Sequence, residues 1–432
     1  MPLFSERIRR IDTENAFKIG PHIVKVESMG KKVVRLNLGE PDFPLPAYIA
    51  REIKRQVDLG NTKYCDPQGI LPLRKALAKH ISETRGLQVG PERVVIFPGG
   101  KPSIGLCQHA YCDPGDEVVY PSPGFPIYES FIRYVDAVPV PLHLKEELNF
   151  SFTGKDLEKL ITKKTKLIYL NFPSNPTGGV ATREQLEGIA DVIKRKCGPD
   201  VRVYSDEIYE HILFDGSKHF SIASVPGMES RTIIASGHSK SFSWTGGRVG
   251  YAVFPTAEEA LAFKNLNINY FSCIPPYNQE AAREAFESPE RDAEIAKMVR
   301  TFQERRDFVV KTLNLIPGIR CQMPKGAFYV FPNIAGVVES LGVLDAYKSM
   351  PPKARKATTP STLFQMFMLY EYAVATMDRK SFGKIGTEGM HFLRLSIANS
   401  MDELKEGVER IRKASQDKKG FAAFFKKGEN LS

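Results

Sequence analysis

Short apolar segments alternate with helical patterns between about residues 65 and 285, and few folds are compatible with that order. Apolar periodicity of the helical kind occurs at 73–81 and 186–193, and Gly86 can end the first of these helices. An alternation of strands and helices predicts an α/β domain with a mostly parallel sheet. The segments typical of buried strands lie at 94–97, 117–120, 167–170, 201–204, 232–235 and 249–253.

The character of the sequence changes after about residue 286. A long, charged helical pattern at 293–315 leads to an apolar strand pattern at 326–331. This order is typical of a second, α+β unit rather than of a continued α/β alternation. We therefore expect three parts: an N-terminal arm at 1–45, which joins the small domain, a large domain at 46–286 and a smaller α+β domain at 287–432.

Four further segments of the C-terminal part have local signals. The prolines and charges of 351–356 predict an exposed loop. Pro360 after Thr359 predicts the start of a helix, and the 400–403 segment Ser-Met-Asp-Glu is a capping box that opens another. The aromatic and basic tail at 421–427 is expected to pack on the body of the protein or to form a loose end, and the alternative is a contact with a membrane surface or a partner.

The composition favours a globular protein of a reducing compartment. Sixty Lys and Arg against 50 Asp and Glu give a net charge of +10, but the charge is spread along the chain, so we expect no nucleic-acid partner. The six cysteines show no C-x-x-C spacing and the eight histidines no ligand spacing, so we expect free thiols, a cytoplasmic location and no bound metal. We also expect no secretory signal and no membrane span.

Polar residues of distinctive chemistry follow the predicted strands directly. Since functional loops of parallel sheets gather at the carboxyl ends of strands, these residues are expected to lie close together. Lys240 has the amine that pyridoxal phosphate (PLP) chemistry requires, and burial beside Arg248 would keep that amine neutral. The alternative is an ordinary surface lysine. The Gly100 to Ser103 turn can bind an anion through its backbone N–H groups, or it is a plain strand-to-helix turn.

Four other side chains extend this set, three of them with a structural alternative. Asp206 either pairs with an arginine or faces the protonated pyridine nitrogen of PLP. Tyr209 and Asn175 can hydrogen-bond the phenolate oxygen of the ring, although Asn-Pro-Thr-Gly is in itself only a turn signal. Arg394 can bind a substrate carboxylate with both arms of its guanidinium, or it is an exposed arginine on an edge strand.

Together these motifs resemble the class I/II aminotransferases, and specifically the aspartate/aromatic branch known as the gamma subgroup. The resemblance runs from the segment at 36–43 to Arg394 and beyond. It implies the fold-type I architecture of PLP-dependent transferases, with a large domain around a mostly parallel sheet and a smaller α+β domain. It also implies pyridoxal 5'-phosphate as the cofactor, and an amino acid and a 2-oxo acid as substrates.

The resemblance implies a role for each matching residue. Lys240, Asp206 and Tyr209 match the catalytic group: the Schiff-base lysine that also moves a proton, the partner of the pyridine nitrogen and a donor to the phenolate oxygen. The phosphate is expected at Gly100, Lys101, Ser239 and Arg248, with Phe125 stacked on the ring. Arg394, Asn175 and the backbone of Gly39 are expected at the substrate carboxylate. Tyr64 matches a tyrosine that reaches the phosphate of the other subunit, which implies a homodimer with shared active sites.

Two features depart from the family pattern. Asp378 and Arg379 stand where relatives commonly have Pro-Gly, and the stretch at 336–370 is longer than usual. Arg379 either forms a surface ion pair with Asp378, which we favour, or reads a carboxylate on the side chain of the substrate. Both features concern the identity of the substrate.

The function that follows is amino transfer between an aspartate-, aromatic- or alanine-like L-amino acid and a 2-oxo acid such as 2-oxoglutarate. A PLP-dependent lyase that cleaves C–S or other β and γ bonds is the alternative, because the cofactor carries both reactions. A ligand-sensing transcription regulator on this fold is a further alternative, but it would have a DNA-binding domain before the Gly39 motif, which comes early in this chain.

Overall fold

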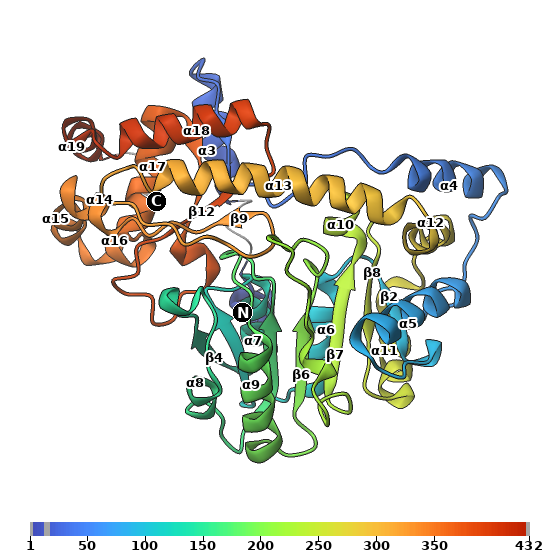
Figure 1. The fold of residues 1–432 in the computed structure, drawn as a ribbon. Coiled ribbons are helices and arrows are strands. Elements are labelled where there is room, and N and C mark those ends of the chain that lie inside the picture. Colours follow the sequence, from blue (N-terminus) through green and yellow to red (C-terminus); the bar gives the residue numbers. More distant parts are fainter. Residues whose placement is uncertain (1–2, 13–17, 429–432) are drawn as a thin grey trace.

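The computed structural model describes residues 3–12 and 18–428. Within them, a central sheet of seven strands has the order β2-β8-β7-β6-β5-β3-β4 (Figure 1). The strand β8 runs antiparallel to both neighbours, and the other pairs are parallel, as the alternating pattern predicts. The strands are β2 (Val94–Phe97), β3 (Glu117–Ser122), β4 (Val138–His143), β5 (Thr165–Asn171), β6 (Arg202–Asp206), β7 (Thr232–Gly237) and β8 (Gly250–Val253).

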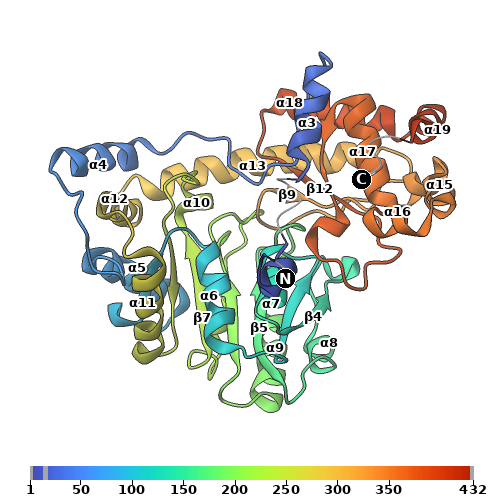
Figure 2. The same cartoon turned by 180° about the vertical axis from the view of Figure 1, so that it is seen from behind.

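Helices cover both faces of this sheet, because both faces of its inner strands are apolar. In β5, Leu167 and Tyr169 pack with helices α6 (Lys101–Tyr111) and α7 (Ile127–Tyr134). The alternate residues Ile168 and Leu170 pack on the other face, with α9 (Arg183–Lys196). The view from behind in Figure 2 shows α6 in front of the sheet. Also on the α6 face is α11 (Ala257–Phe271), whereas α5 (Leu71–Arg85) and α12 (Pro276–Glu287) lie on the α9 face.

The predicted helix ends and the strands of the central sheet are largely confirmed, with one strand of that sheet missed. Gly86 ends α5 in the left-handed conformation with φ 66°, which glycine adopts without strain. The missed strand is β4, whose Pro139 and Pro141 disfavour a strand assignment. It pairs only with β3, at the edge of the sheet. On an edge strand the outward-facing N–H groups have no partner strand, so a proline, which has no N–H group, loses no hydrogen bond there.

The long helix α13 (Arg291–Leu313) connects the large sheet region to a second cluster of elements (Figure 1). That cluster contains a three-stranded antiparallel sheet in the order β11-β12-β9 and a parallel pair of β1 with β10. On this basis we propose the division into an arm at 1–45, a large domain at 46–286 and a small domain at 287–432. The strands are β1 (Val34–Arg35), β9 (Tyr329–Val330), β10 (Val374–Ala375), β11 (Met377–Asp378) and β12 (Leu393–Ser396).

The remaining helices confirm two local predictions and correct a third. Thr359 caps α17 by accepting the N–H of Thr362 at 3.1 Å, and the capping box opens α18. The predicted loop at 351–356 is wrong, because Pro352–Ala357 forms α16: Pro352 suits the first turn, and the residues after it are good helix formers. These helices are α1 (Glu6–Arg10), α3 (Gly20–Ser28), α4 (Ala47–Asp58), α8 (Gly154–Glu158), α10 (His238–Ser241), α14 (Ala335–Ser340), α15 (Val343–Ser349), α16, α17 (Pro360–Tyr372), α18 (Met401–Ala414) and α19 (Lys418–Lys427).

Three further expectations concern a membrane span, a secretory signal and the C-terminal tail. Among the described helices, none combines the length and apolar character that a membrane span needs. The expected absence of a secretory signal rests on the first residues of the chain, and two of these, Met1 and Pro2, lie outside the described residues. The tail packs on the body: Phe421 and Phe424 of α19 are buried, with ring centroids 5.5 Å and 5.7 Å from that of Phe367 in α17.

This packing predicts that α19 contributes to stability. Phe421→Ala removes a buried aromatic ring and should lower the free energy of unfolding by about 3 kcal/mol or more, read from denaturant unfolding. The matched control is Phe425→Ala, since Phe425 lies on the same helix and is only half-buried. Equal losses from the two variants would contradict a packed tail.

Candidate active site

A cavity of about 460 Å³ lies at the carboxyl ends of the parallel strands. The sheet positions its walls: β5 leads to Asn175, β6 ends at Asp206, and β7 leads into α10 with Lys240. The small domain adds Arg394 from β12. All the predicted site residues except Tyr64 line this cavity, namely Gly39, Gly100, Lys101, Phe125, Asn175, Asp206, Tyr209, Ser239, Lys240, Arg248 and Arg394.

Lys240 reaches from α10 toward the N-terminal arm. Its Nζ donates a hydrogen bond to the carbonyl oxygen of Gly39 at 2.5 Å and lies 5.7 Å from the ring centroid of Phe328. The amine is therefore held inside the cavity rather than in bulk solvent. A lysine in this position can act as a nucleophile toward a bound aldehyde or ketone.

Asp206 is a buried carboxylate at the end of β6. Tyr128 Oη donates to its Oδ2 at 2.6 Å, and the N–H of Ile208 lies 3.3 Å from its Oδ1. No arginine donates to it in the described part of the chain, so the arginine pairing is not found. Burial raises the pKa of Asp206 to about 6, although the hydrogen bond from Tyr128 lowers it. A cation placed against this carboxylate would restore its charged form.

The turn after β2 offers an anion-binding cradle. Gly100 caps α6, whose first two residues are Lys101 and Pro102. A side chain on Gly99 would collide with the guanidinium of Arg248, whereas a side chain on Gly100 would meet open space. The N–H groups and the dipole of the helix N-terminus, with Arg248 beside them, favour a phosphate here.

Arg394 is buried, and its strand β12 is the central strand of the small sheet, so the exposed edge-strand alternative is wrong. Its Nη1 donates to Asn175 Oδ1 at 3.2 Å and its Nη2 to the carbonyl oxygen of Asn37 at 2.5 Å. The guanidinium also lies 4.6 Å from the ring centroid of Tyr329. Residues of the arm, the large sheet and the small sheet thus meet at one guanidinium.

Tyrosines complete the polar wall of the cavity. Tyr209 Oη and Tyr329 Oη are 2.9 Å apart, and burial raises the pKa of Tyr209 well above its usual value, so its hydroxyl stays protonated. A side chain at Gly39 would come within 2.6 Å of Tyr329 Oη, which explains the glycine. No sequence motif indicates Tyr128 or Tyr329, and the only signal for Tyr329 is its place in the predicted strand at 326–331.

The family described as aminotransferase class I and II matches residues 31–411. A bifunctional aspartate aminotransferase and glutamate/aspartate-prephenate aminotransferase of Petunia hybrida is 34% identical over 411 residues, which are 95% of this chain and 82% of that protein. The chain belongs to the class I and II aminotransferases.

Solved structures of this family agree with the fold. The aspartate aminotransferase of Rhizobium meliloti is 31% identical, and the match covers 96% of this chain and 99% of that one with a TM-score of 0.86. An aromatic aminotransferase of Pyrococcus horikoshii is 31% identical over 92% of this chain and 100% of its own, with a TM-score of 0.80. The expected fold-type I architecture is confirmed, and these relatives are aminotransferases rather than lyases.

PLP is the cofactor of this family, and the cavity fits it. The volume is in the range of cofactor pockets. The cradle at Gly100 suits a phosphate, and Lys240 suits an aldehyde. The buried carboxylate of Asp206, with its raised pKa, is the counterpart that a protonated ring nitrogen requires.

Arg379 of the aminotransferase was expected to form a surface ion pair with Asp378 or to bind a carboxylate on the substrate side chain, and the structure supports neither expectation. It is 2% exposed, does not line the cavity and has no ion pair with Asp378 among the described residues. Its Nη2 donates to Ser122 Oγ at 2.9 Å and its Nη1 to the carbonyl oxygen of Gly383 at 3.2 Å. Burial lowers the pKa of Arg379 to about 10. It therefore braces the loop that leads from β3 to Phe125 against the small domain.

Within the described residues, one group has the spacing of metal ligands: His80, Glu210 and His211. Glu210 Oε2 already accepts a hydrogen bond from the guanidinium of Arg85 at 2.5 Å. That positive charge opposes a second cation at the same carboxylate. We assign no metal to this group, and the predicted absence of a metal in the enzyme stays a prediction.

The raised pKa of Asp206 predicts a cost in stability when PLP is removed. A carboxyl whose folded pKa of about 6 exceeds the unfolded value of 3.8 stabilises the fold at low pH, and this contribution is lost as the pH rises from about 4 through 6. Without cofactor, Asp206→Asn should therefore be more stable than the parent at pH 7.5, by about 3 kcal/mol, and equal to it below pH 4. Urea unfolding across this pH range measures the difference.

Asp215→Asn is the control of opposite sign. Hydrogen bonds from Arg306 lower the pKa of Asp215 to about 2, so its stabilisation is present at neutral pH and is lost as the pH falls from 3.8 toward 2. This variant should be less stable than the parent at pH 7.5. Identical pH profiles for the Asp206→Asn variant and the parent would contradict the buried, destabilised carboxylate.

Proposed function

We propose that this enzyme transfers the amino group of an aspartate-, aromatic- or alanine-like L-amino acid to a 2-oxo acid such as 2-oxoglutarate. The relatives named above act on aspartate, on prephenate with glutamate or aspartate, and on aromatic amino acids. The observation that carries the proposal is that the Arg394 guanidinium and the Lys240 amine share one cavity. One can bind a carboxylate while the other acts on the adjacent carbon.

The residues around the cavity divide between the parts of the cofactor. When bound, PLP supplies an aldehyde that condenses with amines and a protonated ring that accepts electrons from the substrate. Lys240 would hold the aldehyde carbon, and Asp206 would face the ring nitrogen and keep it protonated. Asn175 and Tyr209 would donate to the phenolate oxygen. The phosphate would be held by Gly100, Lys101, Ser239 and Arg248, with Phe125 stacked on the ring.

The chain's own residues also position the substrate. Arg394, with Asn175 and the backbone of Gly39, would bind the α-carboxylate and so fix the direction of the Cα–H bond. The Lys240 amine would then remove the proton from the substrate Cα as a general base and, as a general acid, give it to the carbon that was the aldehyde carbon of PLP. Its present hydrogen bond to the Gly39 carbonyl lies at the same place where the carboxylate would bind.

A panel of amino donors tests the activity. Purified enzyme with PLP should convert 2-oxoglutarate to glutamate with at least one of aspartate, phenylalanine, tyrosine and alanine. Borohydride should fix the cofactor to the peptide that contains Lys240, and Lys240→Ala should lose both the label and essentially all turnover. Pyruvate and ammonia formed without any 2-oxo acid would instead indicate a lyase, and a label on another lysine would contradict the assignment.

We further infer a homodimer with shared active sites. Tyr64 is 88% exposed and does not line the cavity of its own chain, so it is available to a second subunit. Large apolar side chains are exposed on the same end of the molecule, where α4, α5 and α11 lie together (Figure 1). They include Leu59, Leu71, Leu261 and Tyr270.

Mixed dimers test this sharing. Lys240→Ala subunits should be inactive, and Tyr64→Phe subunits should bind PLP more weakly by about tenfold, since one hydrogen bond to a charged phosphate is lost. Refolded together, they should regain one intact site per mixed dimer, built from Lys240 of one chain and Tyr64 of the other. No gain over the Tyr64→Phe protein alone, or a monomer in light scattering, would contradict the shared site.

The enzyme is also proposed to work in the cytoplasm. All six cysteines are free thiols. Burial raises the pKa of Cys321 to about 12, and of Cys107 well above the usual value, so these thiols stay protonated. Free thiols throughout a chain are typical of reducing compartments.

A further inference from the structure

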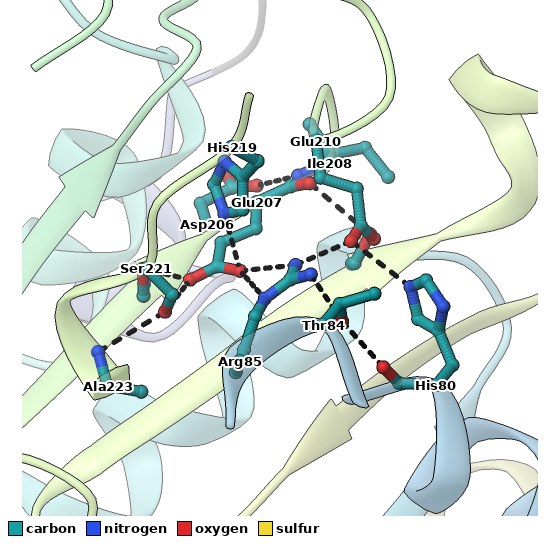
Figure 3. Close-up of polar contacts among 12 residues, drawn as sticks. His80, Thr84, Arg85, Asp206, Glu207, Ile208, Glu210, His219, Ser221 and Ala223 are labelled. Carbon is teal, nitrogen blue, oxygen red and sulfur yellow. Dashed lines mark hydrogen bonds and ion pairs between the residues drawn. The ribbon is translucent and has the colours of Figure 1, made fainter. Parts of the chain in front are cut away.

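Behind the cavity lies a buried cluster of charges centred on Arg85, the last residue of α5 (Figure 3). Arg85 is 6% exposed. Its Nε and Nη2 donate to Glu207 Oε2 at 3.1 Å and 2.7 Å, and Nη2 also donates to Glu210 Oε2 at 2.5 Å. One guanidinium thus ties two carboxylates together, and neither carboxylate lines the cavity.

Every oxygen of these two carboxylates has a donor nearby. Glu207 Oε1 accepts from Ser205 and Ser221, and His219 Nε2 lies 2.8 Å from Glu207 Oε2. Burial alone would raise the pKa of Glu207, but the charge of Arg85 and the hydrogen bonds outweigh it and lower this pKa to about 2. The cluster is therefore charged at neutral pH and fully satisfied by hydrogen bonds, which makes it rigid.

The second carboxylate connects the cluster to the next strand. Glu210 Oε1 accepts from Ser236 Oγ at 2.9 Å and from Tyr251 Oη at 3.3 Å, while His80 Nε2 lies 3.3 Å from Glu210 Oε2. Ser236 belongs to β7 and lines the cavity four residues before Lys240. The cluster thus contacts the backs of two segments that form the cavity wall.

The segment 206–210 has two sides. Asp206 and Tyr209 line the cavity, and the residue that follows each of them, Glu207 and Glu210, is bound to Arg85. A shift of this segment would move the carboxylate and the hydroxyl together. A planar guanidinium fork fixes two carboxylates in direction as well as in distance, which an ammonium group cannot do.

We propose that Arg85 is a positioning residue of the transamination site: it holds the 206–210 segment from behind so that Asp206 and Tyr209 keep their places at the cavity. The proposal rests on the cofactor roles proposed above for those two residues. Tyr128 from α7 and Lys240 from α10 also face Asp206, so the ion pairs of Arg85 are one of several contacts that position this residue. Arg85 itself does not line the cavity.

The holoenzyme of Arg85→Lys tests this inference. We expect the midpoint of the pH titration of the cofactor's visible absorbance to move by about one unit, because both ring contacts loosen. We expect kcat to fall by roughly 100-fold, with the KM for the amino acid little changed, since Arg394 is untouched. Unchanged titration and kcat, with only a lower Tm, would overturn the proposal.

Arg306→Lys is the matched control. Arg306 is 2% exposed and binds both oxygens of Asp215, at 2.9 Å and 2.8 Å, but it does not line the cavity. This variant should lower Tm and leave the absorbance titration as in the parent enzyme. A similar shift of the titration in both variants would show a general loss of packing and would overturn the assigned role of Arg85.

A second variant keeps the test decisive if Arg85→Lys does not fold. Glu210→Gln keeps an acceptor for Ser236 and weakens the pair with Arg85. A smaller shift of the absorbance titration in the same direction supports the proposal, and no shift overturns it.

The parent enzyme separates this inference from the proposed function. If the parent shows no cofactor absorbance and no borohydride label on Lys240, the proposed function fails; if it shows both and the variants titrate as the parent does, only the inference about Arg85 fails.

Discussion

The buried carboxylate of Asp206 is the constraint on which the site depends. Burial raises its pKa to about 6, so its ionised form costs free energy unless a cation faces it. The described neighbours supply only a tyrosine hydroxyl and a backbone N–H group at hydrogen-bond distance. A protonated cofactor ring facing this carboxylate, as proposed above, would stabilise its ionised form and so offset that cost.

The parallel sheet makes this arrangement possible. The strands β5, β6 and β7 end at one edge, so that Asn175, Asp206 and Lys240 converge although they are far apart in sequence. The back of the same edge is held by Arg85, from a helix on the α9 face. In the segment 206–210, the residues that line the cavity are each followed by a residue that forms an ion pair with Arg85.

Much of the fold and most of the candidate site could be predicted from local sequence. Apolar segments and caps identified most strands and the ends of α5, α17 and α18, because those signals lie within a few residues. The contacts that set the chemistry were beyond such reasoning. Glu207 meets Arg85 across 122 residues, and nothing near Tyr128 in sequence indicates its bond to Asp206. The strand β4 was missed for the opposite reason, since its prolines are local signals that the edge of the sheet overrides.

Arg379 shows how a departure from a family pattern can act without touching the substrate. A buried guanidinium with a lowered pKa is costly, so its hydrogen bonds to Ser122 and to the carbonyl of Gly383 must be satisfied in one fixed geometry. Ser122 is the last residue of β3, three residues before Phe125, and Gly383 belongs to the proposed small domain. Arg379 therefore ties the end of β3, close in sequence to the cavity residue Phe125, to the segment around Gly383.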